Sequence, residues 1–278
     1  MSADLTVGQL GLPEHSTSEL SADHAGRIAA TIDATTSVRD GDALPLLWHW
    51  AYFTPDAPTG DLGTDGHPRL PAGPVSRYPR RMWASGTVDA PGHLVVGVPA
   101  TRTSRVVGSK ESAGRSGALL IVRLEHRYRQ EGVDRLVEEQ TLVYREAGPP
   151  LPLPTGEHRA SVKGEQWHER RTLDSIPLFR FSAITFNSHR IHYDQPYAHA
   201  IEGYPELVVH GPLTALLVGE SVRNHFGRDL SRFEFRANAP LFAGSEFTIV
   251  GTPGEPVTVQ VLRNDGVEAM HASATVRA

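Results

Sequence analysis

A group of polar side chains able to transfer or bind protons lies in the segment from Phe179 to Ala198; its members are Asn187, His189, His192 and Asp194. Histidine, with an ordinary pKa of about 6.5, is the side chain best suited to take and give a proton near neutral pH. The Asn187 carbonyl can hold a water molecule but cannot take its proton. Because a predicted turn or short helix separates Asn187 from His192, we expect the two side chains to converge on one water molecule.

Apolar side chains precede this group and are expected to anchor it in a core; they are Phe179, Phe181, Ile184 and Phe186. Asp194 is expected to cap a helix or to support a neighbouring side chain. His189, His192 and Asp194 do not have the spacing of a known zinc motif, and no second cluster of ligands stands out. The sequence therefore predicts no metal site.

An apolar run from Leu207 to about Phe226 follows the turn signals Gly203 and Pro205 and predicts a mostly buried helix. If Gly211 lies in the first turn of this helix, its free backbone N–H can point at a carbonyl oxygen, helped by the positive end of the helix dipole. A glycine there also lets a substrate approach closely. His210, beside it, either contacts the substrate or braces the loop.

Cationic side chains elsewhere are candidates for binding an anionic part of a substrate. Lys110 and Arg115 lie around a predicted hairpin turn, and Arg81 follows Arg80 in a second basic segment. Guanidinium groups suit carboxylates and phosphates, although each of these residues could equally be a solvated surface charge. Acidic side chains offer a further candidate: Glu138 and Glu139 lie on opposite faces of a predicted strand. One of the two can point into the pocket as an extra acid–base group, and a structural ion pair is the alternative.

The elements expected to position these residues follow the same order twice, a helical segment and then several strands. In the first half, residues 21–32 predict a short helix capped by Ser21, and residues 44–53 predict an aromatic helix. A loop rich in Pro and Gly follows over residues 54–77, and such loops are usually functional. Strands are predicted within 94–145, and beyond a proline-rich connector at 148–156 they are predicted at 233–239, 246–250, 257–262 and 267–276.

The stretch FSAITFNSHRIHYDQPYA, with EGYPELVVHGPL after it, resembles the MaoC-like (R)-specific enoyl-thioester hydratases and dehydratases of the hotdog superfamily. It is more similar still to the branch with fungal mitochondrial 3-hydroxyacyl-thioester dehydratases and bacterial mesaconyl-C4-CoA and itaconyl-CoA hydratases. In the N-terminal half, LWHWAYFTPDAPTGDLGTDGHPR, PRRMWASG, GRSGALLIV and LVEEQTLVYRE carry the same resemblance. It covers roughly residues 20–278.

This resemblance implies an α+β protein with a double hotdog fold, in which a curved antiparallel sheet wraps a long central helix in each half. The N-terminal half, with its helix and long loop, is expected at residues 1–150. The catalytic C-terminal half is expected at residues 151–278. The motif departs from the broader family at three positions, because Asn187 replaces the catalytic aspartate and His189 and Arg190 replace an Asn-Pro pair.

The resemblance also implies a hydro-lyase that adds or removes water across the double bond of an enoyl thioester. The acyl group would be of the mesaconyl-C4-CoA or itaconyl-CoA type, or a 3-hydroxyacyl chain on CoA or acyl carrier protein. His192 would transfer the proton, Asn187 would hold the water and Gly211 would stabilise the thioester oxygen. Side chains expected to contact the substrate are His189, His210, Arg115, Lys110 and Arg81. No redox cofactor or metal is implied beyond the thioester carrier.

Two other functions remain open. A hotdog thioesterase would share the fold and substrate but needs a carboxylate base or nucleophile beside the thioester carbonyl, and Asn187 supplies neither. A non-catalytic subunit that binds acyl thioesters would keep the pocket and lose the chemistry.

Composition limits the class of partner. The 278 residues carry a net charge of −5 at pH 7, which gives no general reason to bind nucleic acid or an anionic membrane. We therefore expect a small-molecule partner. The sequence has no cysteine and no apolar run near the roughly 20 residues of a membrane span, which predicts a cytoplasmic protein. A homodimer is compatible with the sequence, since homodimers are the commonest symmetric oligomers, and so is a monomer.

Overall fold

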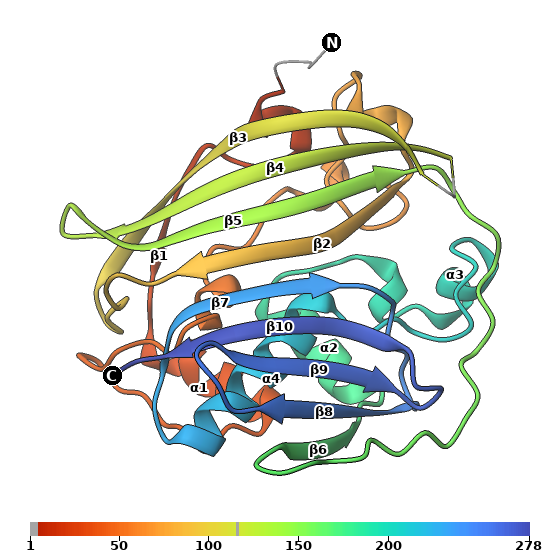
Figure 1. The fold of residues 1–278 in the computed structure, drawn as a ribbon. Helices are drawn as coiled ribbons and strands as arrows, with labels where there is room; N and C mark the ends of the chain where they lie inside the picture. Colours follow the sequence, from red (N-terminus) through yellow and green to blue (C-terminus); the bar gives the residue numbers. More distant parts are fainter. Residues whose placement is uncertain (1–4, 115–116) are drawn as a thin grey trace.

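The computed structural model describes residues 5–114 and 117–278, and the strands of these residues form a ten-stranded antiparallel sheet. Its order is β1-β3-β4-β5-β2-β7-β10-β9-β8-β6. Strands that precede residue 150 therefore occupy one side of the sheet, and strands that follow it occupy the other (Figure 1). The strands are β1 (His15–Glu19), β2 (Arg80–Asp89), β3 (Pro99–Gly114), β4 (Gly117–Gln130), β5 (Val133–Arg145), β6 (Trp167–Thr172), β7 (Leu230–Ala237), β8 (Glu246–Thr252), β9 (Val257–Arg263) and β10 (Glu268–Val276).

The two halves of the sheet meet where β2 pairs with β7. Gly86 lies opposite Phe235 in this pairing. A Cβ atom on Gly86 would lie 2.7 Å from the Phe235 ring, so the aromatic ring covers the backbone at the junction. One buried apolar cluster extends from this junction into both halves.

Four α-helices are found in the described residues: α1 (Ala22–Ile32), α2 (Ser175–Ile184), α3 (Gln195–Ala200) and α4 (Gly211–Phe226). In Figure 1, α1, α2 and α4 lie against the half of the sheet that contains β7 to β10. Helix α4 is buried from Leu213 to Arg223, and it ends at Gly227, whose φ of 66° is left-handed. Among these helices, none combines the length and the apolar character that a membrane span requires.

The expected helix over residues 21–32 is confirmed as α1, with the Ser21 hydroxyl accepting the His24 N–H at 3.3 Å. The expected helix over residues 44–53 is wrong. Only a short 3-10 helix forms there, η2 (Trp48–Ala51), because Leu47 before it has a φ of 80° that no α-helix contains. Trp48 is nevertheless fully buried, so the apolar character of this segment reflects core packing without a helix.

The C-terminal helix begins at Gly211, later than its apolar run. The preceding residues are extended: Val208 bridges to Phe242, and the Val209 N–H donates to the Leu241 carbonyl at 2.9 Å. Pro212 then occupies the first turn of α4, a position where its missing N–H costs nothing. The predicted strands of the C-terminal half are confirmed to within a few residues as β7 to β10. Within residues 94–145 the prediction is confirmed for β4 and β5, but the strand expected at 94–98 is wrong, because β3 begins only at Pro99. The elements β1, β2, β6 and α2 were not predicted.

Candidate active site

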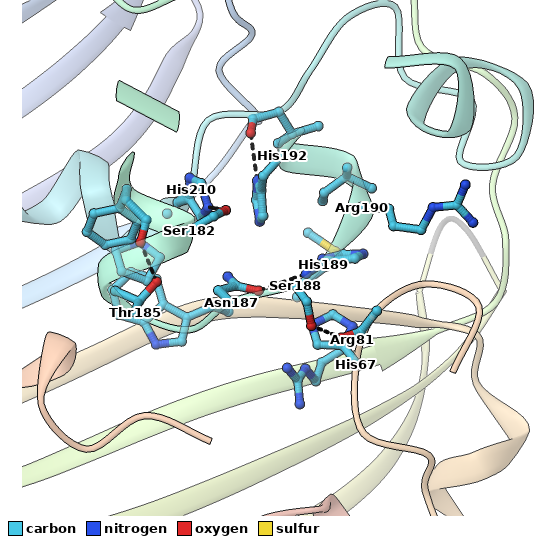
Figure 2. A pocket seen from close by; sticks show the side chains of 18 of the residues that line it. His67, Arg81, Ser182, Thr185, Asn187, Ser188, His189, Arg190, His192 and His210 are labelled. Carbon is cyan, nitrogen blue, oxygen red and sulfur yellow. Dashed lines mark hydrogen bonds between the residues drawn. The ribbon is translucent and has the colours of Figure 1, made fainter. Parts of the chain in front are cut away.

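A cavity of about 1090 Å³ lies between the two halves of the molecule. The N-terminal half contributes His67, Arg81 and Trp83 to its wall, and the C-terminal half contributes the predicted histidine segment and the start of α4. Figure 2 shows Asn187, His189 and His192 around one space, with Arg81 and His67 entering it from the other half. The cavity therefore brings together the residues that the sequence singled out in the C-terminal half, Asn187, His189, His192, His210 and Gly211, with Arg81 from the other half.

His192 is a buried imidazole in the wall of this cavity. It lies at the end of a 3-10 helix, η5 (Arg190–His192), and its Nδ1 is 2.7 Å from the Val208 carbonyl oxygen. Because a carbonyl only accepts, Nδ1 carries the proton and Nε2 keeps a free lone pair. Burial lowers the pKa of His192 to about 4, against the raising effect of the Val208 hydrogen bond. At neutral pH His192 is therefore uncharged and able to take a proton.

His210 holds the ring of His192 in place. The two rings stack with centroids 3.6 Å apart and an angle of 19° between their planes. His210 is almost fully buried, and its Nε2 lies 2.9 Å from the Ser182 hydroxyl. Burial and the neighbouring His192 hold the pKa of His210 well below its usual value. This geometry favours the bracing role of His210 over direct contact with a substrate.

Asn187 lies in the turn that follows α2. Phe186 before it has a left-handed φ of 49°, and the Asn187 Oδ1 accepts the His189 N–H at 3.0 Å. Figure 2 shows the side-chain nitrogen of Asn187 directed toward the His192 ring. The carbonyl expected to hold a water thus already accepts one hydrogen bond within the turn, while the amide nitrogen points into the cavity.

Gly211 is the first residue of α4, as expected, and it lines the cavity. N–H groups in the first turn of a helix have no partner within the helix. A Cβ atom on Gly211 would lie 2.9 Å from the Trp83 ring, and Trp83 itself stacks on Phe235 with centroids 3.9 Å apart. Gly211 therefore combines an available donor with a wall that leaves no room for a side chain.

The expected apolar anchors divide between the core and the surface. Phe181 is buried, but Phe179 and Phe186 are 65% and 64% exposed, so their expected place in the core is wrong. Positions two apart point to nearly opposite sides of a helix, and Leu178 and Phe181 already form the buried face of α2. Phe179 and Phe186 instead line the exposed part of the cavity.

Some of the remaining predicted site residues line the cavity, and others do not. Arg81 and His189 line the cavity. Lys110 is exposed on β3 and is not part of the cavity wall. Arg115 lies outside the described residues. Asp194 caps α3 by accepting the Tyr197 N–H at 3.1 Å and pairs with Arg190 at 2.7 Å, which confirms its expected capping role.

Sequence reasoning missed Asp65 and His67, which lie in the long loop. The Asp65 Oδ2 lies within hydrogen-bond distance, 3.0 Å, of the His67 Nδ1, and the His67 ring centroid lies 4.0 Å from that of His189. Asp65, His67 and His189 each offer a ligand atom within 4.8 Å of the others. The positive charge of Arg81 lowers the pKa of each of these three side chains. The same charge opposes the binding of a metal cation there. The Asp-Gly-His pattern in a loop already expected to be functional was the available signal.

Glu138 is buried outside the cavity wall, and its carboxylate binds side chains that line the cavity. Its carboxylate accepts hydrogen bonds from His49 Nε2 at 3.2 Å, Trp50 Nε1 at 2.8 Å, Tyr128 Oη at 2.6 Å and Gln140 Nε2 at 2.7 Å. Burial alone raises the pKa of Glu138, but His49 and the other donors outweigh it and lower the pKa to about 2. The structural alternative for Glu138 is therefore favoured, and Glu139 points outward.

Glu138→Ala is expected to lower the free energy of unfolding by about 3–5 kcal/mol, because it leaves buried donors without an acceptor. Urea denaturation followed by circular dichroism measures this difference. Glu139→Ala, next to it on the exposed face, is the matched control and should change stability by less than about 0.5 kcal/mol. Equal stability of the two variants would contradict the structural role of Glu138.

Comparison with known proteins decides the family. Residues 47–243 match the model of the Htd2 family, hydroxyacyl-thioester dehydratase type 2. The chain belongs to the Htd2 family. It is 39% identical to mesaconyl-C(4)-CoA hydratase of Chloroflexus aurantiacus over 98% of each chain. It is 28% identical to the mitochondrial hydroxyacyl-thioester dehydratase type 2 of Schizosaccharomyces pombe over 79% of each. This Htd2-family protein is therefore a hydro-lyase.

Solved structures agree on the fold of this Htd2-family chain. A MaoC-like dehydratase from Phytophthora capsici superposes with a TM-score of 0.70 at 14% identity, covering 98% of this chain and 99% of the other. HtdX from Mycobacterium tuberculosis superposes with a TM-score of 0.67 at 15% identity, covering 95% and 99%. Together with the large antiparallel sheet, these similarities show a hotdog fold of the MaoC-like kind.

Proposed function

We propose that this protein hydrates the double bond of an enoyl thioester in the cavity between its halves, with His192 as the base. The main support for this proposal is the tautomer of His192. Its Nδ1–H donates to the Val208 carbonyl, so Nε2 is free to accept a proton. Gly211, at the N-terminus of α4, lines the same cavity. A base and an oxyanion donor are the two groups that water addition beside a thioester requires.

In the hydration direction, His192 Nε2 takes a proton from water as the water oxygen forms a bond to the β-carbon. The electrons of the double bond move toward the thioester, and the negative charge collects on its oxygen. The Gly211 N–H and the dipole of α4 stabilise this oxygen, an effect worth about 3 kcal/mol for a well-placed donor. The enolate then collapses, and His192 gives its proton to the α-carbon, so that the enzyme returns to its starting state.

The acyl group that we propose carries a second carboxylate, as in mesaconyl-C4-CoA, where the free carboxylate is on the β-carbon. The name of the relative that is 39% identical over 98% of each chain supports this choice, and so does Arg81 in the cavity wall. Arg81 helps to lower the pKa of Asp65, but the Asp65 carboxylate bonds to His67. The Tyr144 hydroxyl lies beside the Arg81 guanidinium, but no carboxylate of the described residues forms an ion pair with Arg81, so a substrate carboxylate can pair with it.

We also propose that the hotdog fold is a double one, divided near residue 150. Strands β1 to β5 precede this point and β6 to β10 follow it, and the two sets join through β2 and β7. The long helix α4 belongs to the second set. In this arrangement the C-terminal half supplies the base and the oxyanion donor, and the N-terminal half supplies Arg81 and the loop that contains His67.

The test is incubation of the purified protein with crotonyl-CoA, mesaconyl-C4-CoA and itaconyl-CoA separately, with enoyl-thioester absorbance and free thiol followed together. Loss of absorbance without thiol release is the expected result, fastest with mesaconyl-C4-CoA. Thiol release would instead identify a thioesterase. Saturable binding of these thioesters with neither signal would identify a non-catalytic binding subunit.

Arg81→Met is expected to raise KM for mesaconyl-C4-CoA by about 100-fold, since the lost charge-assisted hydrogen bonds are worth about 1.5–3 kcal/mol. The KM for crotonyl-CoA, which has no carboxylate, should change by less than about threefold. Initial-rate kinetics with both substrates measure the two values. An equal effect on both substrates would show that Arg81 does not bind the second carboxylate.

A further inference from the structure

The loop that contains Asp65 and His67 is fastened to the catalytic segment by several hydrogen bonds. The Ser188 hydroxyl donates to the Gly66 carbonyl at 2.6 Å, and the Arg190 N–H donates to the Asp65 carbonyl at 2.9 Å. Gly66 has a φ of 90°, and a Cβ atom there would lie 1.8 Å from the Ser188 carbonyl oxygen. Only glycine therefore fits between the two segments, and the contact fixes the position of His67 relative to His192.

Asp65 determines which nitrogen of His67 carries the proton. The pKa of Asp65 is lowered, because the His67 hydrogen bond and charge outweigh the effect of burial. Its ionised carboxylate must accept, so the His67 Nδ1, at 3.0 Å, must donate. Burial and then Arg81 lower the pKa of His67 to about 4 in spite of Asp65. His67 is thus neutral, with an unprotonated Nε2.

His67 belongs to a row of imidazoles that leads to the base. Its ring contacts His189, whose centroid lies 5.4 Å from that of His192. His67 and His192 both line the cavity, and a charge on His67 lowers the pKa of His192. Figure 2 shows His67 and His192 on opposite sides of the Asn187–His189 turn. The two neutral imidazoles therefore belong to the wall of the same cavity.

An attacking water has two hydrogens and needs an acceptor for each. His192 Nε2 takes one. The Asn187 Oδ1, expected to hold the water, is turned to the His189 N–H, and the amide nitrogen is the atom directed toward His192 (Figure 2). An acceptor elsewhere in the cavity wall is therefore better placed to take the second hydrogen bond of the water. His67 Nε2 is an acceptor whose tautomer is fixed by an ionised carboxylate, which is the kind of support that aspartate gives to histidine in catalytic triads.

We propose that His67, oriented by Asp65, binds the reactive water through the hydrogen that stays on its oxygen and so replaces the carboxylate that Asn187 does not supply. The inference rests on the proposed function. In the reaction, one water hydrogen passes to His192 and then to the α-carbon. The other remains on the oxygen and becomes the hydroxyl hydrogen of the product, so His67 is unchanged at the end and no further reactant is needed.

Kinetics of three variants test this role, with mesaconyl-C4-CoA and crotonyl-CoA as substrates. His67→Leu removes the acceptor and should lower kcat by about 100-fold with little change in KM. His67→Gln restores a carbonyl acceptor and should recover about tenfold of that loss. Ser188→Ala removes one of the hydrogen bonds that hold the loop but keeps the Asp65–His67 pair. Its loss of kcat therefore measures the effect of loop position alone, and this loss should be clearly smaller than that of His67→Leu.

The other outcomes overturn the inference in recognisable ways. If both His67 variants and Ser188→Ala lose the same activity, the loop is only a structural support. If His67→Leu is fully active while His192→Ala is inactive, the proposed function stands and the inference fails. If the wild-type protein hydrates neither thioester, the proposed function fails and the inference with it. Loss of wild-type activity in EDTA and its return with Zn²⁺ would show that Asp65, His67 and His189 hold a metal instead.

Discussion

His192→Ala is expected to lower kcat for enoyl-thioester hydration by about 10³-fold, within the range that removal of a general acid–base group produces. The variant removes the imidazole whose Nε2 is free to accept a proton, since the Nδ1 proton is held by the Val208 carbonyl. KM should change little, since His192 acts on the water and on the proton at the α-carbon more than on the bound thioester. Initial rates of enoyl absorbance loss measure both constants.

Two controls separate this effect from loss of structure. His271→Ala removes a histidine that is half exposed on β10, and it should retain wild-type kcat. Thermal unfolding of His192→Ala should remain cooperative, because His210 keeps its contacts with Ser182 and Phe181. Near-normal turnover by His192→Ala would end the assignment of His192 as the base and, with it, the proposed mechanism.

The part of the site that the sequence could predict is the part that is local in the chain. Asn187, His192 and Gly211 reach the cavity through a short turn, a 3-10 helix and a helix start, so their spacing carries their geometry. Asp65 and His67 meet His189 across more than a hundred residues. No local pattern encodes that contact, which depends on the loop packing that Gly66 permits.

The fold was predictable for a similar reason. Strands β7 and β9 bury one face and largely expose the other, and this alternation is visible in their residues. Strand β8 is instead a short run buried on both faces. Strand β3 is rich in Thr, Arg and Ser, and its position in the sheet depends on pairing with β1 and β4. Its own residues therefore gave little signal. The aromatic segment around Trp48 was mistaken for a helix because a continuous apolar run has no period that separates helix from buried turn.

Gly211→Ala is expected to lower kcat by about 100-fold, which is the effect of losing one oxyanion donor. The added methyl group would lie 2.9 Å from the Trp83 ring. Trp83 cannot easily retreat, because it stacks on Phe235 and contacts Trp50 edge-on. The start of α4 must therefore move, and its N–H moves away from the thioester oxygen. Crowding of this kind also costs about 1–3 kcal/mol of stability.

Gly26→Ala is the matched control, because a Cβ atom there meets nothing within 4 Å in α1. This variant should keep full activity and gain up to about 1 kcal/mol of stability. The decisive comparison is kcat for Gly211→Ala at a temperature where both variants are fully folded. If Gly211→Ala loses stability but keeps kcat, the glycine serves only packing against Trp83. If kcat falls while KM is preserved, the lost interaction belongs to the transition state, as the charge on the thioester oxygen requires.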